Sequence, residues 1–286
     1  MNVLDQMMST VAIVRGTNPV EMTVKALEMV DASKVVPAEK PVLIKPNYIT
    51  TDPPSTGITT DSRVIEGVVA FLKQHGAREI LIGEGTGFGD TLEAFKVAGV
   101  DKIAEKWGVR MIDLNKDEMI EVRPPNARTL KKVKIAKTAL ESTIVSVPKL
   151  KPHRFTGVTL SLKNMMGVMT PKATMHGHLN QNIVDLVSVV KPSIAVVDGI
   201  IAGEGHETSG NPVEMNLVIT GTDPVAVDAI GSAVMEIPPV SVKHLRLAEE
   251  RGLGTCRLDR IRVVGEPVEK VKKKFRTSFI ARLVQI

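Results

Sequence analysis

Short apolar runs of β type alternate with amphipathic helical segments along much of the chain, and this alternation restricts the fold more than any other feature. Strand-like runs at 41–44, 79–82 and 109–112 end at polar or glycine-rich junctions, and residues 64–72 place apolar side chains on one helical face. Strands that alternate with helices build a parallel sheet through right-handed crossovers. We therefore expect an α/β fold with a mostly parallel or mixed sheet and helices on both faces, an arrangement compatible with two lobes around a cleft.

The rest of the chain continues this rhythm after a less regular middle. Asp223-Pro224 is a typical helix start, because Asp caps the first amides and Pro fits the first turn. We find no low-complexity linker and no internal repeat, so we expect a single α/β unit over residues 1–286. The other expected elements are a hairpin of 119–122 with 131–135, strands at 143–147, 194–197, 216–219 and 261–264, and helices at 182–190 and 241–251.

Composition narrows the chemistry that the chain can support. Aromatic residues make up only 3% of it, so the core must be aliphatic, as in a parallel sheet buried on both faces. Cys256 is the one cysteine, which excludes an internal disulfide and any cysteine-rich zinc or iron–sulfur site made within this chain. We expect no iron–sulfur cluster, and the sequence identifies no other cofactor.

Location and partners follow from charge and hydropathy. No segment reads as a signal peptide, and charged residues interrupt the most apolar region, 183–201, so we expect a cytoplasmic protein without a membrane span. The net charge of +5 is a mild basic excess. Nucleic-acid binding is disfavoured because stacking aromatics and a basic recognition element are missing. Part of the excess lies in the basic C-terminal segment 265–286, for which a solvated tail is favoured over a partner contact.

Ligands of open α/β sheets bind at the strand ends, and two junctions of this chain carry suitable groups. Lys45-Pro46-Asn47 follows the run 41–44 and places a lysine and an amide at the sheet edge. The glycine loop 83–89 follows the next strand and contains Glu84 as a plausible ligand contact. Phe88 replaces the third glycine of a dinucleotide loop, and no Gly-Lys-Ser/Thr follows, so the loop predicts no nucleotide site.

The densest polar cluster follows the strand at 143–147. Lys149, Lys151 and His153 alternate there, and an extended chain directs the two lysines to the same side. If residues 156–166 are helical, Thr159 and Lys163 share a face next to Asn164. Apolar neighbours draw this segment inward. The pattern predicts a site for a carboxylate or phosphate.

Two further groups of residues are candidates. His176 and His178 could bind a metal with Asp198 or Glu204, if their segment is extended, or either imidazole could serve as a general acid or base. Asp228 lies among apolar residues of the helix that begins after Asp223, and a buried carboxylate there needs a partner.

Several of these residues also occur as motifs of a known family. The chain resembles the bacterial and archaeal family "domain of unknown function 362" over roughly residues 40–235. The shared motifs are Lys45-Pro46-Asn47, the run 149–153, Thr159, Lys163-Asn164, Gly167, Val197-Asp198-Gly199, Glu204-Gly205 and the run 221–228. The resemblance implies no assigned reaction. Many relatives carry a ferredoxin-like cysteine segment, which this chain lacks, so a redox role here would need a separate electron carrier.

Three hypotheses follow. The leading one is an enzyme that binds a small anionic metabolite in a lysine-rich cleft; its catalytic candidates are His153, His176, His178 and Lys163, and its binding candidates are Lys45, Asn47, Glu84, Lys149, Lys151, Thr159, Asn164, Asp198, Glu204 and Asp228. The second is a non-catalytic accessory or binding protein for a redox partner. The third is a metal-dependent hydrolase or lyase.

Overall fold

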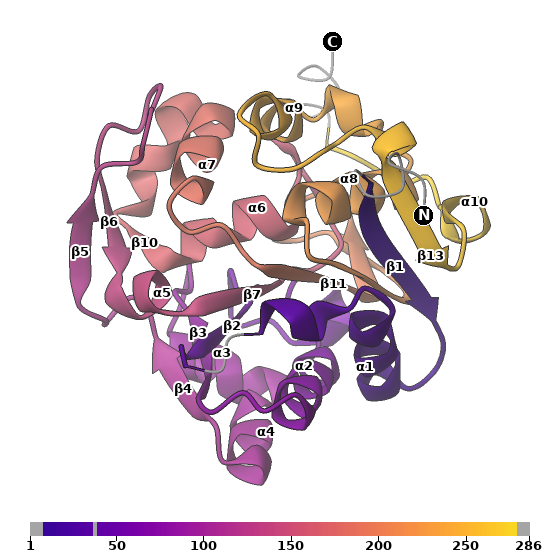
Figure 1. Ribbon diagram of the computed structural model, residues 1–286, viewed down its shortest axis with the longest axis horizontal. Helices are drawn as coiled ribbons and strands as arrows, with labels where there is room; N and C mark the ends of the chain where they lie inside the picture. The colour runs from indigo at the N-terminus through magenta and orange to yellow at the C-terminus, as the bar shows by residue number, and fades with distance from the viewer. Residues whose placement is uncertain (1–7, 37–38, 279–286) are drawn as a thin grey trace.

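An eight-stranded mixed sheet forms the centre of the computed structural model, which describes residues 8–36 and 39–278 (Figure 1). All neighbouring strands are parallel except β12, which runs antiparallel to both of its neighbours. The strands, in spatial order, are β13 (Ile261–Gly265), β1 (Ser9–Arg15), β12 (Asn211–Gly221), β11 (Ile194–Glu204), β7 (Thr143–Val147), β2 (Val42–Pro46), β3 (Ile80–Glu84) and β4 (Arg110–Asp113).

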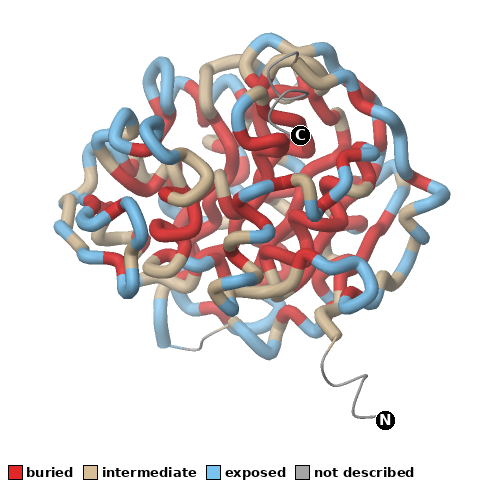
Figure 2. Tube along the Cα trace, turned by 90° about the horizontal axis from the view of Figure 1, so that it is seen from above, coloured by how far each residue is buried: buried red, intermediate tan, exposed pale blue. Residues whose placement is uncertain are grey.

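Helices cover both faces of the sheet, as expected (Figure 1). One face carries α1 (Pro19–Met29), α2 (Ser62–Gln74), α3 (Thr91–Ala98) and α4 (Val100–Trp107), and the other carries α6 (Leu160–Asn164), α7 (Leu179–Val187), α8 (Pro224–Val234) and α9 (Lys243–Glu250). Successive strand residues feed opposite cores because side chains alternate across a sheet: Ile13 packs with one helical layer and Ala12 with the other. The α/β prediction is confirmed, and Figure 2 shows the buried residues running through the middle.

Smaller elements attach to this frame. The expected hairpin is confirmed: β5 (Met119–Val122) pairs antiparallel with β6 (Val133–Ala136), and β10 (Met169–Thr170) adds a third strand. The pair β8 (Pro152–His153) and β9 (Gly157–Val158) precedes α6. The remaining elements are α5 (Lys137–Glu141), α10 (Val268–Val271) and the 3-10 segments η2 (Ala32–Val35), η3 (Pro54–Thr56), η4 (Met165–Val168), η5 (Lys172–His178), η6 (Pro239–Ser241) and η7 (Leu258–Arg260).

Local signals behave as the sequence predicts at the start of α8. The carboxylate of Asp223 accepts hydrogen bonds from the amides of Val225 (2.9 Å) and Ala226 (3.1 Å), and Pro224 occupies the first turn. The strands β11 and β12 differ from expectation, since each extends to eleven residues instead of four. They form a long hairpin that continues past the end of β7, whose pairing with β11 involves only Ile194 and Ala195.

The order of the strands fixes where a ligand can bind. From β2 the chain proceeds through β3 to β4 in one direction, and β7 then lies on the opposite side of β2. This reversal makes a crevice at the carboxyl ends of β2 and β7, the usual ligand position in open α/β sheets. Lys45-Pro46-Asn47 and the run 149–153 lie at that edge.

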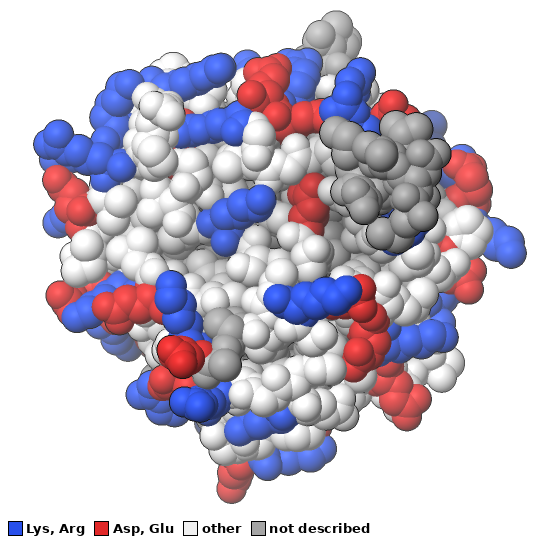
Figure 3. Space-filling model, in the orientation of Figure 1, with Lys and Arg blue, Asp and Glu red and all other residues white. Residues whose placement is uncertain are grey.

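The charged side chains of the surface and the C-terminal segment were also considered in the sequence analysis. Positive and negative side chains are interspersed on the face shown in Figure 3, without a broad patch of one sign. No helix in the described part of the chain is long and apolar enough to cross a membrane. The basic segment 265–286 begins at the last residue of β13 and contains α10, and its residues 279–286 lie outside the described residues.

Candidate functional site

A cavity of about 430 Å³ lies at the carboxyl edge of β2, β3 and β7. A larger and more open hollow of about 750 Å³ lies beside α8, β13 and α10, and it contains none of the candidate residues. The smaller cavity is therefore the candidate site. The predicted residues that line it are Lys45, Asn47, Glu84, Lys151, His153, Thr159, Lys163, Asn164 and His176.

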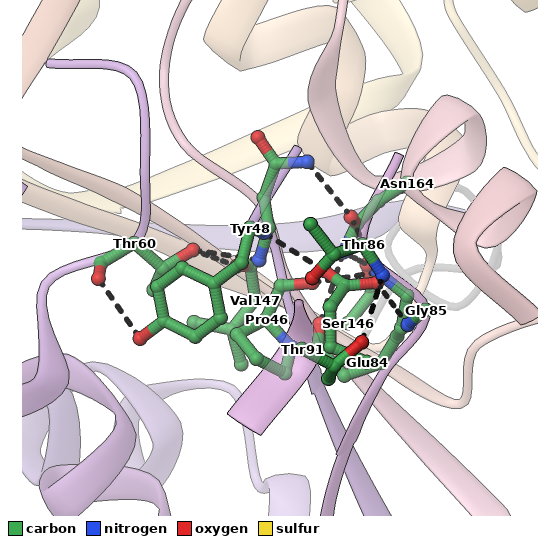
Figure 4. A network of polar contacts seen from close by, with 12 residues as sticks. Pro46, Tyr48, Thr60, Glu84, Gly85, Thr86, Thr91, Ser146, Val147 and Asn164 are labelled. Atoms are coloured by element: carbon green, nitrogen blue, oxygen red, sulfur yellow. Dashed lines mark hydrogen bonds and ion pairs between the residues drawn. The ribbon is translucent and has the colours of Figure 1, made fainter. Parts of the chain in front are cut away.

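Lys45 and Glu84 form a buried ion pair in the wall of this cavity. Lys45 Nζ donates to Glu84 Oε1 (2.6 Å), the Pro46 carbonyl (2.7 Å) and Asn164 Oδ1 (3.0 Å), so all three of its protons are used. Glu84 also accepts hydrogen bonds from the amides of Tyr48 and Gly85, both at 2.8 Å (Figure 4). Burial lowers the pKa of Lys45, and the Glu84 carboxylate opposes that shift. This pair holds the loops after β2 and β3 together.

Gly167 makes this arrangement possible. A Cβ atom at this position would lie 2.6 Å from Lys45 Nζ and closer still to Glu84 Oε1. Only a residue without a side chain lets the backbone of η4 approach the ion pair so closely. The glycine is thus required by packing against the cavity wall.

Two asparagines connect the ends of β2 and α6. Asn164 Nδ2 donates to the Lys45 carbonyl (2.9 Å) and to Ser146 Oγ (3.1 Å), and its Oδ1 accepts from Asn47 Nδ2 (3.3 Å). Asn47 Oδ1 and Thr159 Oγ1 are buried and have no hydrogen-bond partner among the described residues. Buried polar atoms normally have hydrogen-bond partners. Because these two have none among the described residues, they can form hydrogen bonds with a molecule in the cavity.

Lys151 and Lys163 supply charge that no carboxylate among the described residues neutralises directly. Lys151 Nζ donates to two backbone carbonyls, Ile58 O (2.7 Å) and Glu207 O (3.0 Å). Lys163, on α6, is half-buried, and its ammonium has no hydrogen bond or ion pair within the described chain. Burial lowers the pKa of Lys151 to about 7, with Lys163 and Lys149 adding to the shift. Burial likewise lowers the pKa of Lys163 to about 8; Glu207 opposes this shift and Lys45 adds to it.

The lining as a whole is cationic. Its charged side chains are five positive and two negative ones, an excess of three positive charges. The positive residues are Lys45, Lys151, Arg154, Lys163 and Lys172, and the negative residues are Glu84 and Glu207. Buried charge of one sign is costly unless a counter-charge compensates it. The lining formed by the described residues therefore carries a net positive charge.

His153 is held as a neutral imidazole. Its Nδ1 accepts a hydrogen bond from the Phe155 amide (3.2 Å), which assigns the proton to Nε2, 3.6 Å from Glu207 Oε1. Burial, followed by the charges of Lys163 and Lys151, holds the pKa of His153 far below its usual range. In this state it can donate a hydrogen bond from Nε2.

Lys149, one of the predicted anion ligands, is occupied elsewhere. Its ammonium lies 2.6 Å from Asp198 Oδ2, and both side chains are fully buried. Asp198 also accepts from the amides of Asp61 (2.6 Å) and Ile200 (2.9 Å). Neither Lys149 nor Asp198 lines the cavity, and their pair fixes β11 to the segment that follows β7.

Asp228 and Glu204 also have partners outside the cavity. Asp228 accepts hydrogen bonds from the amides of Ser161 (2.7 Å) and Leu162 (2.9 Å), so the partner that its burial requires is the start of α6. This contact positions the helix that carries Lys163. Glu204 Oε1 pairs with Arg276 Nε at 3.2 Å.

The two histidines of the expected metal site do not lie in an extended segment. His176 and His178 belong to the 3-10 segment η5, where residues two apart point in different directions, and both are exposed. His176 lines the cavity and His178 does not. Across residues 8–36 and 39–278, no three His, Cys, Asp or Glu side chains are grouped to hold a metal ion. The expected set with Asp198 or Glu204 is therefore not assembled.

Sequence reasoning missed several lining residues. Phe88 and Phe155 lie at the rim with 68% and 40% of their surface exposed, and the Arg154 guanidinium stacks 4.8 Å above the Phe155 ring. Glu207 enters from the tip of the β11–β12 hairpin, where its Oε1 lies 3.0 Å from Arg154 Nε. Lys172 donates to Asn115 Oδ1 (2.6 Å). The sequence offered one signal for the rim: Phe88 and Phe155 lie in polar loops of a chain in which aromatic residues make up only 3%.

Comparisons with known proteins identify relatives of this chain. The thylakoid-associated protein sll1697 of Synechocystis sp. is 22% identical over 223 residues, which cover 74% of this chain and 68% of that protein. The family described as "Domain of unknown function (DUF362)" matches residues 42–233, a range that includes β2, α6, all but the last residue of α8 and every predicted site residue. The chain therefore belongs to the DUF362 family.

Proposed function

We propose that the cavity binds a small organic anion, a carboxylate or phosphate ester with an apolar part, and that the chain is an enzyme acting on it. The observation that carries this proposal is the half-buried ammonium of Lys163, which has no acceptor within the described chain. Lys151 next to it meets only backbone carbonyls. A ligand carboxylate or phosphate would provide the missing counter-charge.

The apolar part of the ligand is inferred from the rim. Ile49, Phe88, Phe155 and Met166 line the same cavity as the lysines. A volume of about 430 Å³ lies within the usual range for small-molecule sites, which combine apolar walls with a few polar groups. An inorganic ion alone would leave these apolar surfaces exposed to water.

Proton transfer is the chemistry that the cations support. A general acid or base works best when its pKa lies near the working pH, and the pKa values of Lys151 and Lys163, about 7 and about 8, meet that condition. His153, held neutral, would donate a hydrogen bond to the ligand. Asn47 and Thr159 offer their unpartnered oxygens for orientation.

Calorimetric titration of the full chain with benzoate and phenyl phosphate tests the proposal, with benzamide as the neutral analogue. We expect saturable binding of the two anions and none of benzamide. Lys163→Met should lose this binding, whereas Lys191→Met, at an exposed position, should retain it. Equal affinity for benzamide, or unchanged binding in Lys163→Met, would contradict an anion site in this cavity.

We also infer a cytoplasmic location from the sequence, and cell fractionation tests it. The name of the Synechocystis relative associates that protein with thylakoids. Recovery of this chain with washed membranes instead of the soluble fraction would overturn the inference.

A further inference from the structure

The five positively charged side chains that line the cavity differ in their hydrogen-bond and ion-pair partners. Lys45 faces Glu84, Arg154 faces Glu207, Lys172 faces the side chain of Asn115, and Lys151 meets two backbone carbonyls. Lys163 alone among them has no acceptor in the described part of the chain.

This position makes the neutral amine of Lys163 easier to reach than that of an exposed lysine. No group within residues 8–36 and 39–278 accepts a proton of Lys163 Nζ, while Lys45 and Lys151 contribute like charge nearby. A lysine amine in such a setting, partly removed from water and close to other cations, becomes a nucleophile toward carbonyl carbon. The lowered pKa of Lys163, about 8, agrees with this reading.

We propose that Lys163 forms an imine with the carbonyl carbon of an oxo acid whose carboxylate is held in the same cavity. This inference rests on the proposed anion site and adds the reactive group of the ligand. Lys151 is the natural partner for the carboxylate, because its ammonium lines the cavity and pairs with no carboxylate in the part of the chain that the structure describes.

The step balances within the cavity. The Lys163 amine lone pair attacks the carbonyl carbon, the C=O π electrons move to oxygen, and proton transfer gives a neutral carbinolamine. Protonation of its hydroxyl group, with Lys151 as the nearby acid, then releases water as the C=N bond forms. No oxidant or reductant is consumed. Thr159 precedes Lys163 by four residues, and its unpartnered hydroxyl can donate to the carbinolamine oxygen.

Reductive trapping of the full chain tests this chemistry. Phenylpyruvate fits both the carboxylate and the aromatic rim, and cyanoborohydride reduces a protonated imine to a stable secondary amine. We expect intact-mass spectra to show a single adduct and peptide mapping to place it on Lys163. Phenyllactate, which carries a hydroxyl in place of the carbonyl, should bind in calorimetry and give no adduct.

Matched variants separate this proposal from the anion site. Lys163→Arg keeps the charge and cannot form an imine, so it should lose the adduct; Lys191→Arg, at an exposed position, should keep both phenyllactate binding and the adduct. Phenyllactate binding without an adduct on Lys163, or equal labelling of Lys163→Arg, overturns the imine and leaves the anion site. Failure of the wild-type chain to bind either acid overturns both.

Discussion

Replacing Lys149 by methionine should destabilise the protein without removing its ligand site. The change deletes one member of an ion pair at 2.6 Å in which both side chains are fully buried. Breaking a buried pair from one side costs about 3–5 kcal/mol, because the remaining charge loses its partner. Asp198 would still accept two backbone hydrogen bonds, from Asp61 and Ile200, which favours the lower end, about 3 kcal/mol.

A loss of this size is measurable by thermal denaturation. For a domain of this size each kcal/mol lowers the melting temperature by roughly 2–4 °C, so we expect a decrease of roughly 6–12 °C. The double variant Lys149→Met/Asp198→Asn should recover most of that loss, since no unpaired charge remains. Lys163→Met, which removes an ammonium that has no partner among the described residues, should leave the melting temperature unchanged or raise it.

Ligand binding provides the second half of this test. Folded Lys149→Met should bind benzoate with wild-type affinity in the calorimeter at a temperature well below its midpoint, because Lys149 lies outside the cavity. Loss of benzoate binding together with an unchanged melting temperature would refute the assignment of Lys149 to structure and return it to the ligand site.

Other outcomes follow from the same geometry. Gly167→Ala should lower stability by about 2 kcal/mol in denaturant unfolding, since the new methyl group overlaps Glu84; an unchanged midpoint would contradict the packing argument. Because burial lowers the pKa of Lys151 and Lys163, the folded ligand-free chain binds fewer protons than the unfolded chain between about pH 7 and 10. Its unfolding free energy should therefore rise with pH across that window, and anion affinity should fall above pH 8; the opposite slopes would refute the buried lysines. Phe88→Ala should weaken binding of benzoate and leave that of acetate unchanged, and equal weakening of both would exclude an apolar role for the rim.

The fold was predictable because its signals are local. Alternating strand and helix patterns, the cap at Asp223 and the hairpin of β5 with β6 all appear within short stretches of sequence. The direction and length of β11 and β12 were not predictable, since pairing between distant strands decides both. The alternation of apolar residues identifies a strand, but it does not reveal with which other strand it pairs in the sheet.

The site was predictable as a place on the sheet but not as a set of roles. The sequence predicted both Lys149 and Lys163 as ligand-binding residues, but their roles differ because their partners in the folded chain differ. Asp198 neutralises Lys149, and no described residue forms an ion pair with Lys163. The pairing depends on residues up to 49 positions apart, and no spacing rule encodes it. Glu207 was missed for the same reason, because the hairpin that carries it reaches the cavity only in the folded chain.

The charged residues and the apolar rim of the cavity come from two different kinds of chain segment. Its central cations come from buried or half-buried positions packed against the core: Lys151 directly precedes β8, and Lys163 belongs to α6. The rim comes from exposed loop side chains, Phe88 and Phe155, which contribute little to the core. Substitution at the rim can therefore change which anion fits while the fold and the preference for negative charge persist. A protein built this way can acquire new ligands at low cost to its stability.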